Sequence, residues 1–306
     1  MSSNDAGNFE NIPSRLTQYL RGAAVDFDRE AFYYFAAAFL GVFYLRKNLL
    51  TGETCDFLEP RKNTRGNIWY GHTGRIVLIG ETLFMMRSSP GFAELCRRLG
   101  GRDFRSTYFE MYAARIFLEA GYQIRARPES GIKGQDFDFQ ASRDDETVNV
   151  EVTALTAKRF SAQTVENALN QKRKQLPDTE PALIFCVFPE DWALTPNLGG
   201  LLNEPVARFF QSTRKVGAVV FMVETYVTDK DAPVGNFWMH HVCLFHPNPR
   251  KPVKSASFFA ADAWINTRRS PGEPPTMRRE SEFFAWADSI FLSRDSVAQK
   301  TQGHRD

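Results

Sequence analysis

Residues 136–154 read DFDFQASRDDETVNVEVTA, in which two runs of alternating polar and apolar side chains are joined by a polar link. A period of two is typical of β-strands, because successive side chains point to opposite faces of a sheet. The runs at 136–141 and 148–154 are therefore predicted to form a hairpin, with its turn in the link at 142–146. Acidic side chains would lie on one face of this hairpin, and phenylalanine and valine side chains on the other.

The segments on both sides of the hairpin predict an α/β core. Upstream, residues 105–120 have apolar side chains at helical spacing, Gly121 stands where a helix C-terminal cap is expected, and a short strand at 122–126 follows. Downstream, we expect a helix at 161–176 and a buried strand at 182–188, which reads ALIFCVF. This order of elements predicts a mixed sheet flanked by helices rather than a regular βαβ array.

The remaining chain divides into a mainly helical first part and a less regular last part. We predict three regions: residues 1–100, mainly helical; 101–250, the α/β core; and 251–306, a C-terminal extension with a helix. The boundary between the first two is placed at Gly100–Gly101. Further helices are predicted at 28–48, 75–87, just before 100, 203–213 and 279–292, and further strands at 217–223 and 237–245.

Bulk composition limits the classes of function. The chain has 306 residues and 38 Lys plus Arg against 36 Asp plus Glu, so its net charge is only +2. Any nucleic-acid binding must therefore come from local basic patches, and small clusters such as Arg97–Arg98 are expected to be solvated or to line such a groove. The longest apolar stretch, 31–45, is shorter than the roughly 20 residues that span a bilayer. With no C-x-x-C spacing and no signal pattern, we expect a cytoplasmic protein that does not enter the membrane.

The acidic residues of the hairpin predict a metal site. If the turn is centred between residues 144 and 145, Asp138 lies opposite Glu151, and Asp136 lies opposite Thr153. Directly opposed side chains have Cβ atoms about 4.5–5.5 Å apart, where like charges destabilise a sheet. A divalent cation that prefers hard oxygen ligands, Mg²⁺ or Mn²⁺, would neutralise them. The same pattern also describes an exposed hairpin with one solvated face, and a shifted turn would exchange the two aspartates.

A lysine on the following helix strengthens the metal hypothesis. The apolar stripe of the helix at 161–176 contains Lys172 among its apolar members, and Gln175 lies on the same side. A lysine on a stripe that faces the core either extends to the surface or reaches a cluster of carboxylates. Beside an acidic pocket that lacks a cation, the second interpretation is favoured.

Together these residues resemble the PD-(D/E)XK, or restriction-endonuclease-like, superfamily. Its core is a helix that bears an acid, a hairpin that bears Asp and Glu-x-Lys, and then a helix and a strand. Here Glu110 would be the helix acid, Asp136 or Asp138 the hairpin Asp, and Glu151 the Glu of the Glu-x-Lys motif. The resemblance covers roughly residues 105–188.

The chain departs from the family pattern at one position. Thr153 stands where the motif Lys is expected, two residues after Glu151. Some members of the superfamily supply this Lys from the following helix, and Lys172 is well placed for that role, with Lys174 and Lys158 as weaker candidates.

The resemblance implies a Mg²⁺- or Mn²⁺-dependent nuclease that hydrolyses phosphodiester bonds in nucleic acid, with DNA favoured over RNA. The metal ligands would be Asp138, Glu151 and Asp136. Lys172 would orient the attacking water and offset the charge of the transition state, Gln175 would contact the water or the phosphate, and Glu110 would be an outer ligand.

Two other classes of function remain open from the sequence. The missing motif Lys is compatible with a catalytically inactive domain that binds nucleic acid or protein. Residues 1–100, rich in aromatic side chains, could also serve as a module for partner binding or for a homodimer.

Overall fold

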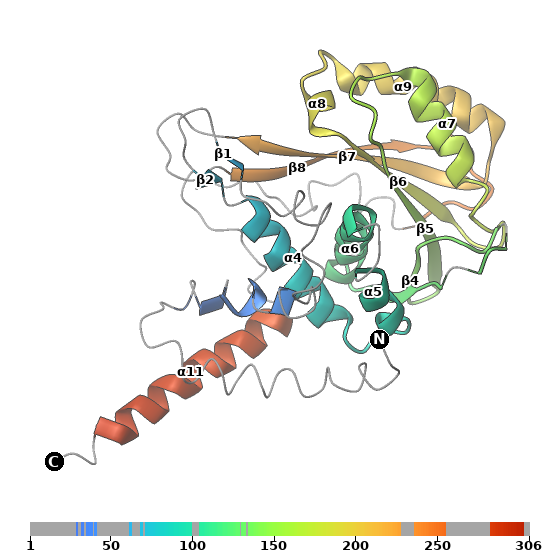
Figure 1. Cartoon of the computed structure of the whole chain (residues 1–306). Helices are drawn as coiled ribbons and strands as arrows, with labels where there is room; N and C mark the ends of the chain where they lie inside the picture. Colours follow the sequence, from blue (N-terminus) through green and yellow to red (C-terminus); the bar gives the residue numbers. More distant parts are fainter. Residues whose placement is uncertain are drawn as a thin grey trace.

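A six-stranded mixed sheet forms the centre of the chain (Figure 1). The computed structural model describes residues 29, 32–33, 35–38, 40–41, 61–62, 68–69, 71–99, 104–128, 130–132, 134–227, 236–254 and 282–302. The strands lie side by side in chain order: β3 (Gln123–Ala126), β4 (Phe139–Arg143), β5 (Glu146–Ala154), β6 (Ala182–Phe188), β7 (Val216–Val227) and β8 (Asn236–Phe245). β5, β6 and β7 are parallel, whereas the other neighbours are antiparallel. The predicted α/β class with a mixed sheet is confirmed.

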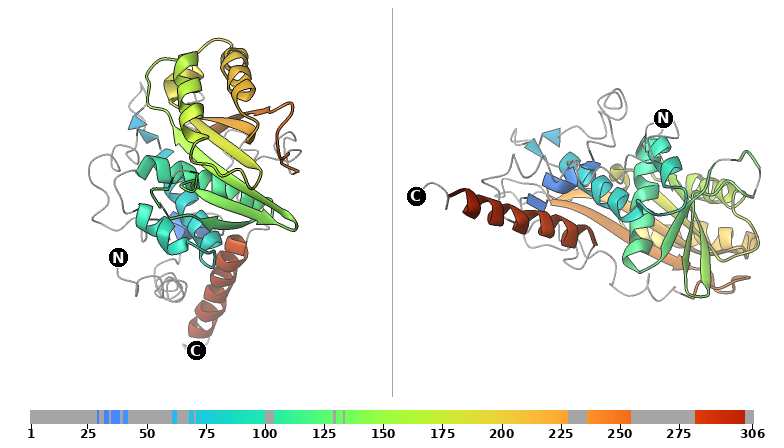
Figure 2. Two further views of the ribbon diagram at one scale, coloured as in Figure 1. Left: turned by 90° about the vertical axis from the view of Figure 1, so that its right-hand side faces the viewer. Right: turned by 90° about the horizontal axis from the view of Figure 1, so that it is seen from below.

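Helices cover both faces of the sheet (Figure 1), and the turned views keep them in two separate layers (Figure 2). One layer holds α4 (Gly71–Met86), α5 (Phe92–Leu99) and α6 (Phe104–Glu119), and the other holds α7 (Ala162–Lys172), α8 (Glu190–Ala193) and α9 (Leu198–Ser212). We call these the α6 face and the α7 face. Strand β6 is buried along its whole length because its side chains alternate between two cores. Leu183, Phe185 and Val187 join the core of the α6 face, whereas Ile184 and Cys186 join that of the α7 face.

The hairpin has the predicted turn but a shorter first strand. Phe139 pairs with Val150 and Arg143 pairs with Glu146, so the turn is centred between residues 144 and 145, as expected. However, β4 begins at Phe139 instead of residue 136. The expectation that both phenylalanines share one face is wrong, because Phe139 lies in the core of the α6 face and Phe137 in that of the α7 face.

The observed ends of the other helices and strands agree with the prediction in some cases and differ in others. Strand β6 has the predicted bounds, and Gly121 has a left-handed φ of 82° directly after the turn that ends α6, as expected of a cap. Helix α7 ends at Lys172 rather than residue 176, because the chain tightens there: the Gln175 amide donates to the Lys172 carbonyl at 3.0 Å. Helix α9 begins at Leu198, five residues before its predicted start. The two-residue strands β1 (Arg61–Lys62) and β2 (Ile68–Trp69), and also α8, were not predicted.

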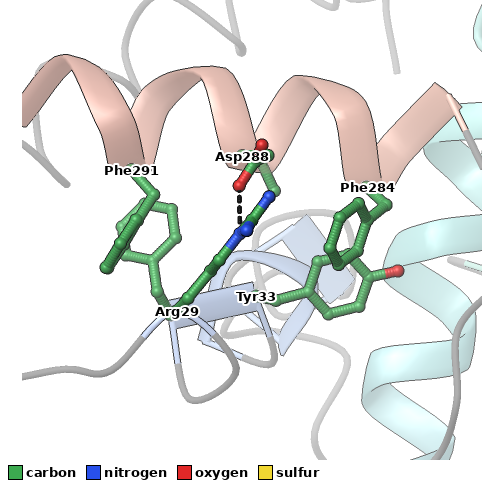
Figure 3. Close-up of a pocket in the computed structure, with 7 residues that line it drawn as sticks. Arg29, Tyr33, Phe284, Asp288 and Phe291 are labelled. Carbon is green, nitrogen blue, oxygen red and sulfur yellow. Dashed lines mark ion pairs between the residues drawn. The ribbon is translucent and has the colours of Figure 1, made fainter. Parts of the chain in front are cut away.

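Helix α11 (Glu282–Gln302) packs against the helical residues between 29 and 41 (Figure 3). The Tyr33 ring lies 5.0 Å from the ring of Phe283, and Arg29 forms an ion pair with Asp288. Phe283 also belongs to the core of the α6 face. The two ends of the described chain are thus joined by an aromatic contact.

The described residues between 29 and 41 are helical, as predicted for 28–48. Gly100 and Gly101 lie outside the described residues, so the three-part division stays a prediction, as does a homodimer through residues 1–100. No helix in the described ranges carries an apolar stretch long enough to cross a lipid bilayer.

Candidate active site

Three of the four predicted acids, Glu110, Asp138 and Glu151, come together at the end of β5. Val150 is the last residue of β5 that pairs with β4, so Glu151 and the residues after it have no strand on that side. Instead, the Asp138 side chain covers this edge: the Val152 amide donates to Asp138 Oδ2 at 2.6 Å. Side chains from both faces of the sheet can therefore meet here. We call Glu110, Asp138 and Glu151, together with Arg98 and Lys172, the acidic cluster.

Glu151 lies at the centre of this cluster. It is only 1% exposed, and it points away from the α6 face because its neighbours Val150 and Val152 occupy that face. Lys172, the last residue of α7, donates from Nζ to Glu151 Oε1 at 2.5 Å. Burial raises the pKa of Glu151 to about 7, although Lys172 acts in the opposite direction.

Asp138 and Glu110 extend the cluster towards α5 and α6. Burial, and then the nearby Glu151 carboxylate, raise the pKa of Asp138 to about 7. Burial, and then Asp138, raise the pKa of Glu110 to about 8. Three carboxyl groups thus share a site in which the charged form of each is disfavoured, and an added cation would relieve this repulsion.

Arg98 is a member of the cluster that was not predicted from the sequence. Its Nη1 lies 2.8 Å from Glu110 Oε2 and 3.7 Å from Asp138 Oδ1. Sequence inspection placed Arg97–Arg98 among solvated basic clusters, which describes Arg97, whose side chain is 61% exposed, but not Arg98, at 10%. Helical periodicity gives the signal, because Arg98 lies three residues after the buried Leu95.

Two buried side-chain oxygen atoms, one on β5 and one in the turn after α7, could accept a further donor or a cation. Among the described residues, neither Glu151 Oε2 nor Gln175 Oε1 has a hydrogen-bond partner. Gln175 Oε1 in this orientation and Glu151 Oε2 in the ionised carboxylate are acceptors, so a donor or a cation would satisfy them. Gln175 itself lies in the turn that follows α7 rather than on its predicted helical stripe.

Asp136 is held apart from the acidic cluster. Its Oδ1 accepts from both the backbone N and the Oγ of Ser130, each at 2.6 Å, and these hydrogen bonds lower the pKa of Asp136. The prediction that Asp136 sits on a strand opposite Thr153 is wrong, because these local bonds draw it into the loop before β4. Of the three candidate lysines, Lys174 and Lys158 are exposed and Lys172 reaches the carboxylates.

The cluster has the oxygen donors that Mg²⁺ or Mn²⁺ would require, and the unpartnered Oε2 of Glu151 fits such an ion. Over the described part of the chain, however, no three or more His, Cys, Asp or Glu side chains are spaced to hold a metal ion. Arg98 lies close to two of the three carboxylates and Lys172 binds the third. The geometry is therefore that of carboxylates neutralised by basic side chains of the same chain.

Comparisons with protein-family models, with curated proteins and with solved structures find no match. Evidence for a function therefore comes from the geometry of the acidic cluster and from the order of its residues along the chain.

Proposed function

We propose that the protein is a metal-dependent nuclease with a displaced motif lysine. The supporting observation is the contact of Lys172 Nζ with Glu151 Oε1 at 2.5 Å. This contact supplies a lysine next to the motif Glu from the following helix, whereas Thr153 takes the usual place of that lysine in the chain. The restriction-endonuclease-like fold is part of the same proposal, supported by the order α6, β3, β4, β5, α7, β6.

In this proposal the carboxylates of Asp138 and Glu151 hold Mg²⁺ or Mn²⁺, with Glu110 as an outer ligand. When bound, the ion would polarise the phosphoryl oxygen and lower the pKa of a water molecule. Lys172 would place a positive charge beside the oxygen on which negative charge develops. The Gln175 side chain would contact the water or the phosphate: its buried Oε1 could accept from the water, and its amide nitrogen could donate to a phosphate oxygen.

Nucleic acid is the proposed substrate, with DNA favoured over RNA. Lys158 and Arg159 are exposed on the bend that follows β5, the strand that carries Glu151. Basic side chains in such a position can contact the phosphate backbone without reading the base sequence.

A second candidate function is a catalytically inactive domain that binds nucleic acid or protein. The observation that favours it is the ion pairing within the cluster, because Arg98 and Lys172 already neutralise the carboxylates. The two candidates differ in whether a divalent cation is needed.

Cleavage assays with matched variants separate them. A panel of single- and double-stranded DNA and RNA is incubated with the purified chain in Mg²⁺, Mn²⁺ or EDTA. We expect metal-dependent cleavage, which Glu151→Gln and Lys172→Met each reduce by about 10²–10³-fold, the usual loss for one preorganised charged group. The controls are Glu204→Gln, an exposed glutamate on α9, and Lys174→Met, an exposed lysine two residues from Lys172; both should retain full activity.

Two outcomes would count against the proposed nuclease. No cleavage of any substrate by the folded wild-type chain, combined with retention of a nucleic acid in a binding assay, would favour the inactive binding domain. Full activity of Glu151→Gln would contradict the proposed site.

A further inference from the structure

Arg98 makes contacts that a bound cation would make. Its guanidinium reaches Glu110 at 2.8 Å and Asp138 at 3.7 Å, and it also donates to the Arg127 carbonyl oxygen. The side chain is 10% exposed, so these contacts lie in a largely desolvated setting where charge pairs are strong. One fixed positive charge therefore serves two carboxylates that repel each other.

We propose that Arg98 competes with the divalent cation for the acidic cluster. The inference depends on the metal site of the proposed function and adds to it a residue that controls metal affinity. While the guanidinium holds the Glu110 and Asp138 oxygens, those oxygens are turned towards nitrogen donors and cannot close around an ion. A divalent cation binds only when Arg98 moves aside. This competition accounts for carboxylates that are close in space yet not spaced as a metal group.

The structure provides a place for the displaced side chain. Arg98 Nε already lies 3.2 Å from Glu94 Oε1, one helical turn earlier on α5. Glu94 is partly exposed and also binds Arg97, so it would retain the Arg98 guanidinium near the surface. The displacement therefore requires only a rotation of one side chain, and no helix has to move.

Metal binding by the full chain tests the competition without an activity assay. Free Mn²⁺ is measured by electron paramagnetic resonance during titration of wild type, Arg98→Gln and Arg97→Gln, each checked for folding by circular dichroism. We expect Arg98→Gln to bind Mn²⁺ about tenfold or more tightly than wild type, because one adjacent positive charge is removed. Arg97→Gln removes an exposed arginine of the same helix that pairs with Glu94, and its affinity should match wild type.

A double variant tests whether Mn²⁺ binds at the acidic cluster. The gain in affinity should disappear in Arg98→Gln/Glu151→Gln, because the ion would then lack its central ligand. If Arg98→Gln does not fold, Arg98→Lys decides the question by the same criterion: it keeps a positive charge but loses the planar fork, so a smaller gain is expected.

Each outcome has one meaning. Equal or weaker Mn²⁺ binding by the folded Arg98 variant, with measurable binding by wild type, overturns the competition and leaves the proposed metal site in place. No Mn²⁺ binding by any variant overturns both the competition and the metal-dependent nuclease. A gain that persists in the double variant also overturns the competition, since the ion would then bind elsewhere.

Discussion

Two buried charge networks of the same chain can be compared. The first, which we call the α4–α6 network, consists of Arg75 and Glu81 on α4, Arg115 and Glu119 on α6, and Glu224 on β7. The second is the acidic cluster. Each contains three carboxylates and two basic side chains, so their formal charges are equal.

Neutral hydroxyl donors distinguish the two networks. In the α4–α6 network, Tyr33 donates to Glu81 at 3.1 Å and Tyr108 donates to Glu224 at 3.2 Å. In the acidic cluster, Glu151 Oε2 has no hydrogen-bond partner among the described residues, whereas Glu81 Oε2, which also accepts no hydrogen bond, forms an ion pair with Arg115. Because a buried polar group without a partner destabilises the fold, a network closed by hydroxyl donors is suited to stability. The open network is suited to binding something that the chain does not itself provide.

The largest expected effect is on stability in the α4–α6 network. Arg75→Met removes the partner of Glu224, a residue only 6% exposed, and leaves its charge buried. We expect the free energy of unfolding to fall by about 3–5 kcal/mol, as is usual when one member of a buried ion pair is lost. Urea denaturation measures the change. Arg97→Met, which breaks an exposed pair, should cost less than about 1 kcal/mol.

The Mn²⁺ affinity of Arg75→Met tests whether the α4–α6 network and the acidic cluster are independent of each other. At a temperature where it remains folded, Arg75→Met should bind Mn²⁺ as wild type does. A loss of metal affinity would show that the two networks are coupled, and the division between a structural and a functional network would then be wrong.

Replacement of Glu151 in the acidic cluster should have the opposite effect to replacement of Arg75. The pKa of Glu151 is raised from 4.5 to about 7 in the fold, so the folded chain binds its proton more tightly than the unfolded chain does. The stability that this proton provides is fully present below pH 4.5 and is lost as the pH rises through about 7. In EDTA at pH 8, Glu151→Gln should therefore be more stable than wild type by about 1–3 kcal/mol.

The difference between Glu151→Gln and wild type should vanish below pH 4.5, where the Glu151 carboxyl is neutral in both the folded and the unfolded chain. Urea denaturation at the two pH values measures it, with Glu204→Gln as the surface control. A variant that is less stable than wild type at pH 8 would place Glu151 among structural ion pairs rather than in a binding site.

The sequence predicted the elements of the cluster better than its contacts. The run ALIFCVF has no alternation and stands beside a proline, so a strand buried on both faces was recognisable. The polar link identified the hairpin turn, and the interruption of an apolar stripe identified Lys172. These features depend on spacing along the chain, which is visible without a structure.

The failures have two physical causes, which are hydrogen bonds that side chains make outside regular strand pairing and contacts between residues far apart in the chain. Residues 136–138 alternate as a strand would, but Asp136 binds Ser130, and the Asp138 carboxylate accepts from the Val152 amide where a longer β4 would pair. Arg98 was missed because its carboxylate partners on α6 and before β4 lie 12 and 40 positions away in the chain. Such contacts exist only once the helices have packed on the sheet.

The smallest expected effect concerns His241 on β8, the edge strand next to the α4–α6 network. His241 on β8 stacks on Tyr112 of α6 with 6.0 Å between ring centroids. Burial, and then the charge of His240, lower the pKa of His241 to about 3. The fold therefore favours the neutral ring, and the stability that this provides is present above pH 6.5 and is lost as the pH falls towards 3.

Between pH 7 and pH 4, wild type should lose about 1–2 kcal/mol more stability than His241→Gln, which cannot be protonated. Denaturation at the two pH values measures this difference. His240→Gln, a change at the exposed neighbour, removes the smaller of the two causes and should retain most of the acid sensitivity of wild type. Equal acid sensitivity in wild type and His241→Gln would show that His241 is solvated in solution.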